Sequence, residues 1–227
     1  MTKNTQKILI VLTSHDKLGT TGRKTGAYLG EVTHPYEEFQ KAGFEVDFVS
    51  PRGGAAPLDG VNLEDPINQK WMNDATFKQK IASTLEPNQI NPSSYAAIFF
   101  AGGHGTMFDF PQDSRLAQIT AQIYEASGVV GAVCHGPSGL VNVKLSNGAY
   151  LVSGKRVSSF SNTEEDAVKL TDQMPFLLES KLIERGGLYS KAPNFEAHSV
   201  SDQRLVTGQN PASATGVAQK MIVAIRA

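Results

Sequence analysis

The sequence contains one cysteine, Cys134, among its 227 residues. A single cysteine excludes an internal disulfide and any metal cluster built on several thiolates. A lone thiol is also more typical of a reducing compartment than of the secretory route. We therefore expect a cytoplasmic protein that folds without disulfide bonds.

The sequence also lacks an excess of positive or negative charge, and its first apolar run is short. The 21 basic and 22 acidic residues leave a formal net charge of −1, so no strong field attracts nucleic acid or an anionic membrane. The first apolar stretch, Ile8–Leu12, is too short for a signal-peptide core or a membrane span. We expect neither a nucleic-acid partner nor a membrane partner.

The common cofactor and metal motifs are absent too. The sequence has no GxxxxGK[ST] phosphate loop and no GxGxxG that opens a helix. No metal-ligand spacing such as HExxH occurs, and the histidines outside the cysteine motif are scattered: His15, His34, His104 and His198. We expect no cofactor and no metal.

Apolar runs alternate with segments of helical pattern along the whole chain. Strands are expected at Lys7–Thr13, Glu45–Ser50, Ala96–Ala101, Val129–Val133, Tyr150–Ser153, Arg156–Ser159 and Arg204–Thr207. Helices are expected at Pro35–Ala42, Asp113–Ala126, from Thr163, at Pro175–Arg185 and at Pro211–Ala227. This alternation predicts one α/β domain over residues 1–227, with a mostly parallel central sheet. Pro51–Asn73, rich in Gly, Pro and Asp, is expected to be a loop excursion over the strand ends.

The segment around Cys134 has the pattern of a nucleophile elbow. An apolar strand runs into the cysteine, and small residues surround the turn, in the sequence GVVGAVCHGPSG. A helix starting there would direct its N-terminus at the sulfur and favour an accessible thiolate. A lone cysteine is more often a buried core residue, but the coincidence of strand, cysteine, glycines and helix start favours a nucleophile.

Other residues are candidates for the same site. His135 is a candidate base, and its peptide N–H is a candidate oxyanion donor. Gly103, in the turn AGGHGT, could supply the second donor. Glu31, in GEVTHP, would face the same cavity, although taken alone it reads as a surface acid. Either Glu164 or Glu165 could orient His135.

Five segments resemble the ThiJ/PfpI superfamily and, within it, the heat-shock-type, glutathione-independent glyoxalase III branch. In chain order they are GAYLGEVTHPYEEFQKAGFEVDFVSP, FFAGGHGTMFDF, AVCHGPSGL, SFSNTEEDAV and LVTGQNPAS. The resemblance covers nearly the whole chain and implies a flavodoxin-like three-layer sandwich and a homodimer. Unlike larger relatives, the chain has a compact Pro51–Asn73 segment, which argues against their chaperone behaviour or metal site.

The resemblance also implies roles for single residues. Cys134 would be the nucleophile, His135 its catalytic partner and Glu31 the nearby acid. Glu165 occupies the position of the triad acid, with Glu164 as the neighbouring alternative. Gly103 and His135 match the oxyanion positions.

Three functions follow from these residues. The first is a glyoxalase that converts 2-oxoaldehydes such as methylglyoxal to 2-hydroxy acids through a cysteine hemithioacetal, with Glu31 or His135 moving a proton between the two carbons. The second is a cysteine hydrolase, that is, a deglycase, amidase or peptidase. The third is a redox-sensing, chaperone-like protein with an exposed cysteine.

Overall fold

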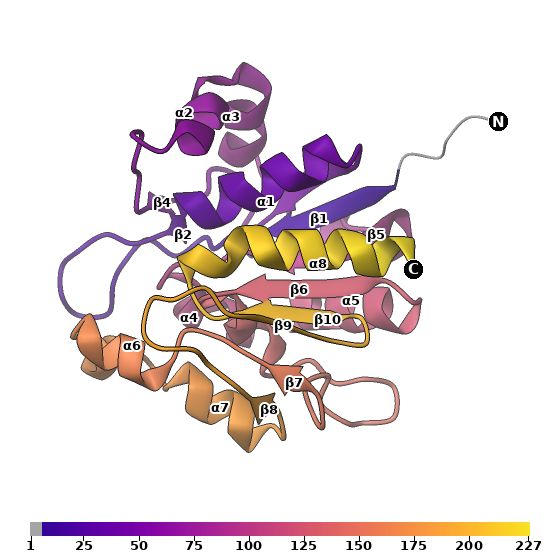
Figure 1. Ribbon diagram of the computed structural model, residues 1–227. Helices are drawn as coiled ribbons and strands as arrows, with labels where there is room; N and C mark the ends of the chain where they lie inside the picture. Colours follow the sequence, from indigo (N-terminus) through magenta and orange to yellow (C-terminus); the bar gives the residue numbers. More distant parts are fainter. Residues whose placement is uncertain (1–5) are drawn as a thin grey trace.

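The computed structural model describes residues 6–227, and a six-stranded sheet in the order β3-β1-β5-β6-β10-β9 forms its centre (Figure 1). Its strands are β1 (Lys7–Val11), β3 (Glu45–Val49), β5 (Tyr95–Phe100), β6 (Val129–Val133), β9 (Ser199–Asp202) and β10 (Leu205–Gly208). Of these six strands, five pair in parallel and β9 at the edge is antiparallel. The predicted α/β class with a mostly parallel sheet is confirmed.

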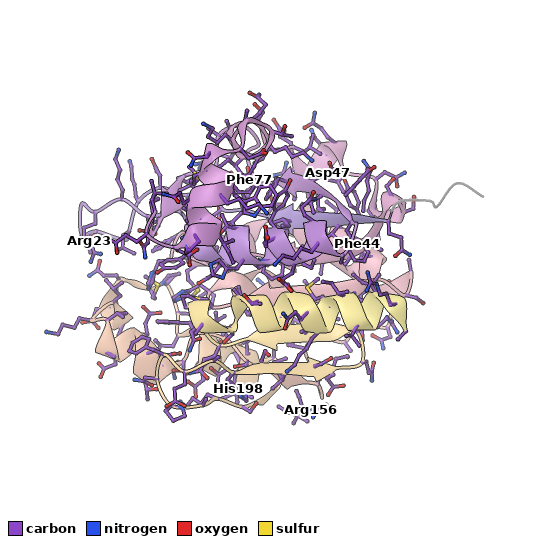
Figure 2. The ribbon with its side chains drawn as sticks, turned by 45° about the horizontal axis from the view of Figure 1, so that its top comes forward. Arg23, Phe44, Asp47, Phe77, Arg156 and His198 are labelled. Carbon is purple, nitrogen blue, oxygen red and sulfur yellow. The ribbon has the colours of Figure 1, made fainter. Side chains whose placement is uncertain are left out.

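Helices cover both faces of the sheet. They are α1 (Leu29–Lys41) and α8 (Ala214–Arg226), which lie side by side on one face, and α5 (Ser114–Glu125) on the other (Figures 1 and 2). Alternate residues of β1 enter the two cores: Ile8 and Ile10 face the α1 side, while Leu9 and Val11 face the α5 side. Burial on both faces explains why the strand sequence is continuously apolar.

Smaller elements surround this sandwich. Two-stranded sheets join β2 (Ala27–Tyr28) to β4 (Leu58–Asp59) and β7 (Arg156–Val157) to β8 (Leu188–Tyr189). The remaining α-helices are α2 (Pro66–Asn73), α3 (Ala75–Ala82), α4 (Thr106–Asp109), α6 (Asn162–Ala167) and α7 (Leu178–Glu184). In the described part of the chain, no helix combines the length and hydropathy that crossing a membrane requires.

Three predicted elements differ from the structure. The helix expected at Pro35 begins at Leu29, six residues earlier, and Pro35 lies inside it. The strand expected at Tyr150–Ser153 is a turn that places the apolar Leu151 and Val152 in the core. The last eight residues of the expected excursion Pro51–Asn73 form helix α2, in which the N–H groups of Ile67 and Asn68 are capped by the side chain of Asp65.

Candidate active site

Cys134 lies directly after β6, at the carboxyl edge of the parallel strands. Its backbone has φ of 58°, in the left-handed region that non-glycine residues rarely adopt. The surroundings fix this conformation, because the N–H of Cys134 donates to the carbonyl of Gly208 at 3.0 Å and its carbonyl accepts from Phe160 at 2.8 Å. Strained residues held in this way cluster at active sites. Here the turn directs the side chain of Cys134 away from the sheet.

The Cys134 thiol is buried, with 4% of the residue exposed. Burial and the neighbouring carboxyl group of Glu31 raise the pKa of the thiol well above its usual value, while the N–H groups of His135 and Gly103 act in the opposite direction. The predicted accessible thiolate is therefore wrong for the resting protein. The helix expected to favour it is a five-residue 3₁₀ helix, Gly136–Leu140. The resting sulfur carries its proton and needs a base to remove it.

His135 is placed to act as that base. Its Nδ1 lies 3.4 Å from the sulfur of Cys134, and its Nε2 lies 2.6 Å from Oε2 of Glu165. Burial lowers the pKa of His135, so the ring is neutral at neutral pH. Burial alone would raise the pKa of Glu165, but hydrogen bonds from His104 and His135 outweigh it and lower the value to about 2. Since an ionised carboxylate only accepts, Nε2 of His135 holds the hydrogen and Nδ1 is free to receive the thiol proton.

Glu164 points to a different part of the structure. Its Oε2 accepts from both the N–H and the hydroxyl of Ser161, which forms the capping box of α6. Its Oε1 accepts from the N–H of Phe195 at 2.8 Å and from the side chain of Asn210 at 2.8 Å. Of the two adjacent acids, Glu165 therefore contacts His135, and Glu164 anchors the loop that carries Phe195.

Glu31 lies in the first turn of α1 and is fully buried. Its Oε2 accepts the N–H of Gly102 at 2.9 Å, whereas Oε1 has no hydrogen-bond partner among the described residues. Burial raises its pKa to about 8, and contacts with Cys134 and Gly102 only partly offset this effect. At neutral pH most of the group is a carboxylic acid beside the sulfur, able to donate a hydrogen bond or, once ionised, to take a proton.

Two backbone N–H groups face the sulfur, those of Gly103 and His135. Gly103 has φ of 101°, and a side-chain carbon there would lie 2.2 Å from the carbonyl oxygen of Gly26, so the turn requires glycine. The buried hydroxyl of Thr106 lies 2.9 Å from the carbonyl of Gly103 and 3.0 Å from that of His135. Thr106 thus holds the peptide that follows each of the two N–H groups predicted as oxyanion donors.

A cavity of about 360 Å³ opens onto Cys134. Its walls are mostly apolar and aromatic, with a few polar groups: Leu18, Arg23, Tyr28, Asp59, Phe160, Val168, Leu170, Phe195 and Pro211. Arg23 comes from the loop after β1. This loop projects at the end of the molecule where the parallel strands have their carboxyl ends (Figures 1 and 2). A mostly apolar hollow of this size suits a small organic molecule.

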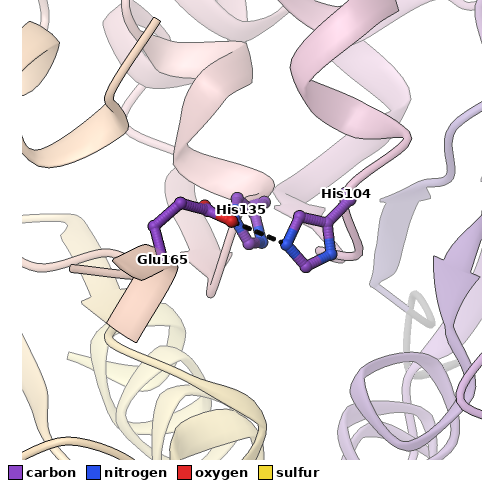
Figure 3. Close-up of side chains that lie close together, drawn as sticks. All are labelled: His104, His135 and Glu165. Atoms are coloured by element: carbon purple, nitrogen blue, oxygen red, sulfur yellow. Dashed lines mark hydrogen bonds and ion pairs between the residues drawn. The ribbon is translucent and has the colours of Figure 1, made fainter. Parts of the chain in front are cut away.

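The sequence did not indicate His104, which the structure places in this site. Its Nε2 lies 2.9 Å from Oε1 of Glu165, so one carboxylate binds two imidazoles (Figure 3). The ligand atoms of His104, His135 and Glu165 lie within 4.8 Å of one another, a spacing that a metal ion would also accept. Each carboxylate oxygen already accepts an imidazole nitrogen, so we assign the three residues to a hydrogen-bond network. The signal that could have indicated His104 is the turn AGGHGT, in which the sequence analysis selects only Gly103.

Comparison with known proteins identifies the family. A model of the DJ-1/PfpI family matches residues 24–224. The chain is 35% identical to the glutathione-independent glyoxalase HSP31 of Saccharomyces cerevisiae, over 97% of this chain and 98% of that protein. It is also 35% identical to glyoxalase 3 of Candida albicans, over 96% of this chain and 98% of that protein.

Solved structures agree with this result. The Rapid Encystment Protein 24 kDa of Francisella tularensis superposes with a TM-score of 0.94 at 41% identity, over 97% of this chain and 99% of its own. Glyoxalase III of Candida albicans superposes with a TM-score of 0.90 at 30% identity, over 96% and 97% of the two chains. The resemblance predicted from the sequence motifs is confirmed, and the chain belongs to the DJ-1/PfpI family.

Proposed function

We propose that the protein is a glutathione-independent glyoxalase that converts 2-oxoaldehydes such as methylglyoxal to 2-hydroxy acids, here lactate. The observation that carries the proposal is the buried carboxyl group of Glu31 beside the Cys134 sulfur, with its pKa near 8. Moving a proton between two adjacent carbons requires a base of this kind, whereas hydrolysis at a thiolate does not. The named activity of the relatives supports the same assignment.

In the first step His135 takes the thiol proton at Nδ1 while the sulfur attacks the aldehyde carbon, C1, of methylglyoxal. The negative charge that develops on the aldehyde oxygen is stabilised by the N–H groups of Gly103 and His135. Return of the proton from His135 to this oxygen gives a neutral hemithioacetal.

In the second step ionised Glu31 removes the hydrogen from C1 as a proton, and an enediolate forms between C1 and C2. The hydroxyl proton moves from the C1 oxygen to the C2 oxygen, and Glu31 returns its proton to C2, which gives a lactoyl thioester on Cys134. Water activated by His135 then attacks the thioester carbon, and the sulfur leaves with the proton from His135. The sum is addition of one water to methylglyoxal, and no cofactor takes part.

A cysteine hydrolase is the second candidate, and the arrangement of Cys134, His135 and Glu165 supports it. This arrangement and the two N–H donors would also serve acyl transfer from an amide, an ester or a glycated amine. A hydrolase needs no group that moves a proton between two carbons, which is the role that Glu31 fits, and we therefore rank it second. The redox-sensor hypothesis requires an exposed, acidic thiol, and the burial of Cys134 argues against it.

Product analysis separates these functions. The protein without glutathione is expected to convert methylglyoxal to lactate, measured by proton NMR, faster than it hydrolyses a peptide, an ester or a glycated amine at equal concentration. Hydrolysis of any of these without lactate formation would favour the second candidate and contradict the proposal.

The pH dependence of turnover is a separate prediction. Burial raises the pKa of Glu31 from 4.5 to about 8, so the base form is the minor species below that pH. We expect kcat/KM to fall by about tenfold for each pH unit below 8 and to level off above it. A profile that is flat from about pH 6 to pH 8, measured at constant ionic strength, would contradict a role for ionised Glu31.

We propose four further properties of the protein. The lone cysteine supports a cytoplasmic location. The resemblance to the family supports a homodimer and a single domain over residues 1–227. The near-zero net charge supports a small molecule, and no nucleic acid or membrane, as the partner.

A further inference from the structure

His104 is a titratable group in the cavity that the mechanism above does not use. It follows β5, and its ring lies beside that of His135, with the ring centroids 4.2 Å apart. Its side chain is 19% exposed, and it lines the same cavity as Cys134. Figure 3 shows one ring nitrogen directed at Glu165 and the other directed away from it.

The hydrogen bond to Glu165 determines which ring nitrogen of His104 carries the hydrogen. Glu165 is ionised and can only accept, so Nε2 of His104, 2.9 Å from Oε1, must be the donor. A neutral ring then has its lone pair on Nδ1. Glu165 thus fixes the tautomers of two imidazoles at once, and both keep Nδ1 as an acceptor.

Only one of these two acceptors is occupied. Nδ1 of His135 faces the sulfur, whereas Nδ1 of His104 has no hydrogen bond to any described residue and belongs to a partly exposed ring on the cavity wall. A free acceptor held in one orientation next to a nucleophile is suited to a hydroxyl group of the bound substrate.

We propose that His104 is a further catalytic base of this site, whose Nδ1 moves the hydroxyl proton of the hemithioacetal from the oxygen on C1 to the oxygen on C2. The inference rests on the proposed glyoxalase function and extends it. It divides the proton transfers between two residues: Glu31 serves the carbons, and His104 serves the oxygens.

The step balances in atoms and electrons. When Glu31 removes the proton from C1, the C1–H electron pair forms the C1–C2 double bond, and the C2=O pair moves onto its oxygen. Nδ1 of His104 takes the proton of the C1 hydroxyl and delivers it to that C2 oxygen. The electron pair left on the C1 oxygen then forms the thioester carbonyl as C2 takes its proton from Glu31. His104 ends neutral, and no oxidant or reductant is consumed.

The variant His104→Gln distinguishes proton transfer by Nδ1 of His104 from a role in which His104 only positions Glu165. The amide nitrogen of glutamine corresponds to Nε2 and can still donate to Glu165, but the side chain has no base at the Nδ1 position. We expect kcat/KM for methylglyoxal to fall by about 10²-fold or more, the usual range for loss of a general acid or base. The rate at which iodoacetamide alkylates Cys134 should stay within about threefold of wild type, because that rate depends on the sulfur and His135.

A matched variant and a second substitution complete the test. His198→Gln alters a histidine that hydrogen-bonds to Ser190 and does not line this cavity, and it should turn over like wild type. If thermal unfolding shows that His104→Gln does not fold, His104→Ala assayed with and without added imidazole takes its place: imidazole should restore turnover of methylglyoxal, and a failure to restore it would overturn the inference.

Two results would overturn the inference alone: wild-type turnover in the His104 variant, or alkylation that slows as much as turnover, which would assign the residue to positioning Glu165. Absence of lactate formation by the wild-type protein would instead refute the proposed function, and the inference with it.

Discussion

Replacing Cys134 by serine is expected to abolish turnover of methylglyoxal, with kcat/KM lower by about 10⁴-fold or more. His135 is neutral and lies 3.4 Å from the sulfur, whereas the hydroxyl of serine has a shorter bond to Cβ, a much higher pKa than a thiol and a lower nucleophilicity toward the aldehyde carbon. Serine differs little in size and adopts the same backbone, so the midpoint of thermal unfolding should change little. The measurement is kcat/KM together with the unfolding temperature.

The single cysteine offers a chemical control for this substitution. Because Cys134 is the only thiol in the chain, iodoacetamide should inactivate the wild-type protein in proportion to the fraction alkylated, as measured by intact mass. Turnover that survives either complete alkylation or the serine substitution would show that the reaction does not pass through this sulfur.

Replacing Glu31 by glutamine is expected to lower kcat/KM by about 10²-fold or more. The amide is nearly isosteric and can still donate a hydrogen bond to the sulfur, but it cannot accept a proton from carbon. Alkylation of Cys134 should therefore continue at a comparable rate while glyoxalase turnover is lost. Glu37→Gln is the matched control: it lies on the same helix, pairs with Lys41 and Lys70, and should leave turnover unchanged.

Glu31→Gln, which lowers turnover, should raise the stability of the folded protein at pH 8. The folded-state pKa of Glu31 is about 8, above its ordinary value of 4.5, so between these values the folded protein holds a proton that the unfolded chain has released. Stability therefore falls as pH rises through this window, by a few kcal/mol at most. Glutamine removes this dependence, and Glu31→Gln should unfold at a higher temperature than wild type at pH 8 but not near pH 4.5. A variant with unchanged turnover and no gain in stability at pH 8 would mean that Glu31 is a solvated acid outside the site.

The sequence predicts the sheet well because each buried strand is a continuous apolar run. It predicts helix α1 less well, since Pro35 reads as a helix start and conceals the preceding turn that carries Glu31. The sequence predicts a strand at Leu151–Val152, where the structure has a turn, because a buried turn and a short buried strand both appear in the sequence as a short apolar run.

The site was predicted where a local pattern carries the chemistry, as at Cys134 and His135. Glu164 and Glu165 are neighbours on α6, and their side chains leave the helix about 100° apart. Only the three-dimensional arrangement shows which of them faces His135. His104 was missed because it joins the network through the parallel pairing of β5 with β6, which places two distant turns at the same sheet edge. The burial of the thiol was missed for a similar reason, since Glu31 and α1 cover it from another part of the chain.

The most direct test of the account is the fate of the C1 hydrogen when the reaction runs in D₂O without glutathione. A proton carried by Glu31 can exchange with solvent during the enediol step, so we predict lactate with deuterium at C2, seen by proton NMR as loss of the C2 hydrogen signal and of its coupling to the methyl group. Lactate that keeps only the original hydrogen at C2, formed at the same rate by wild type and Glu31→Gln, would show direct hydride transfer between the carbons and contradict the proton shuttle.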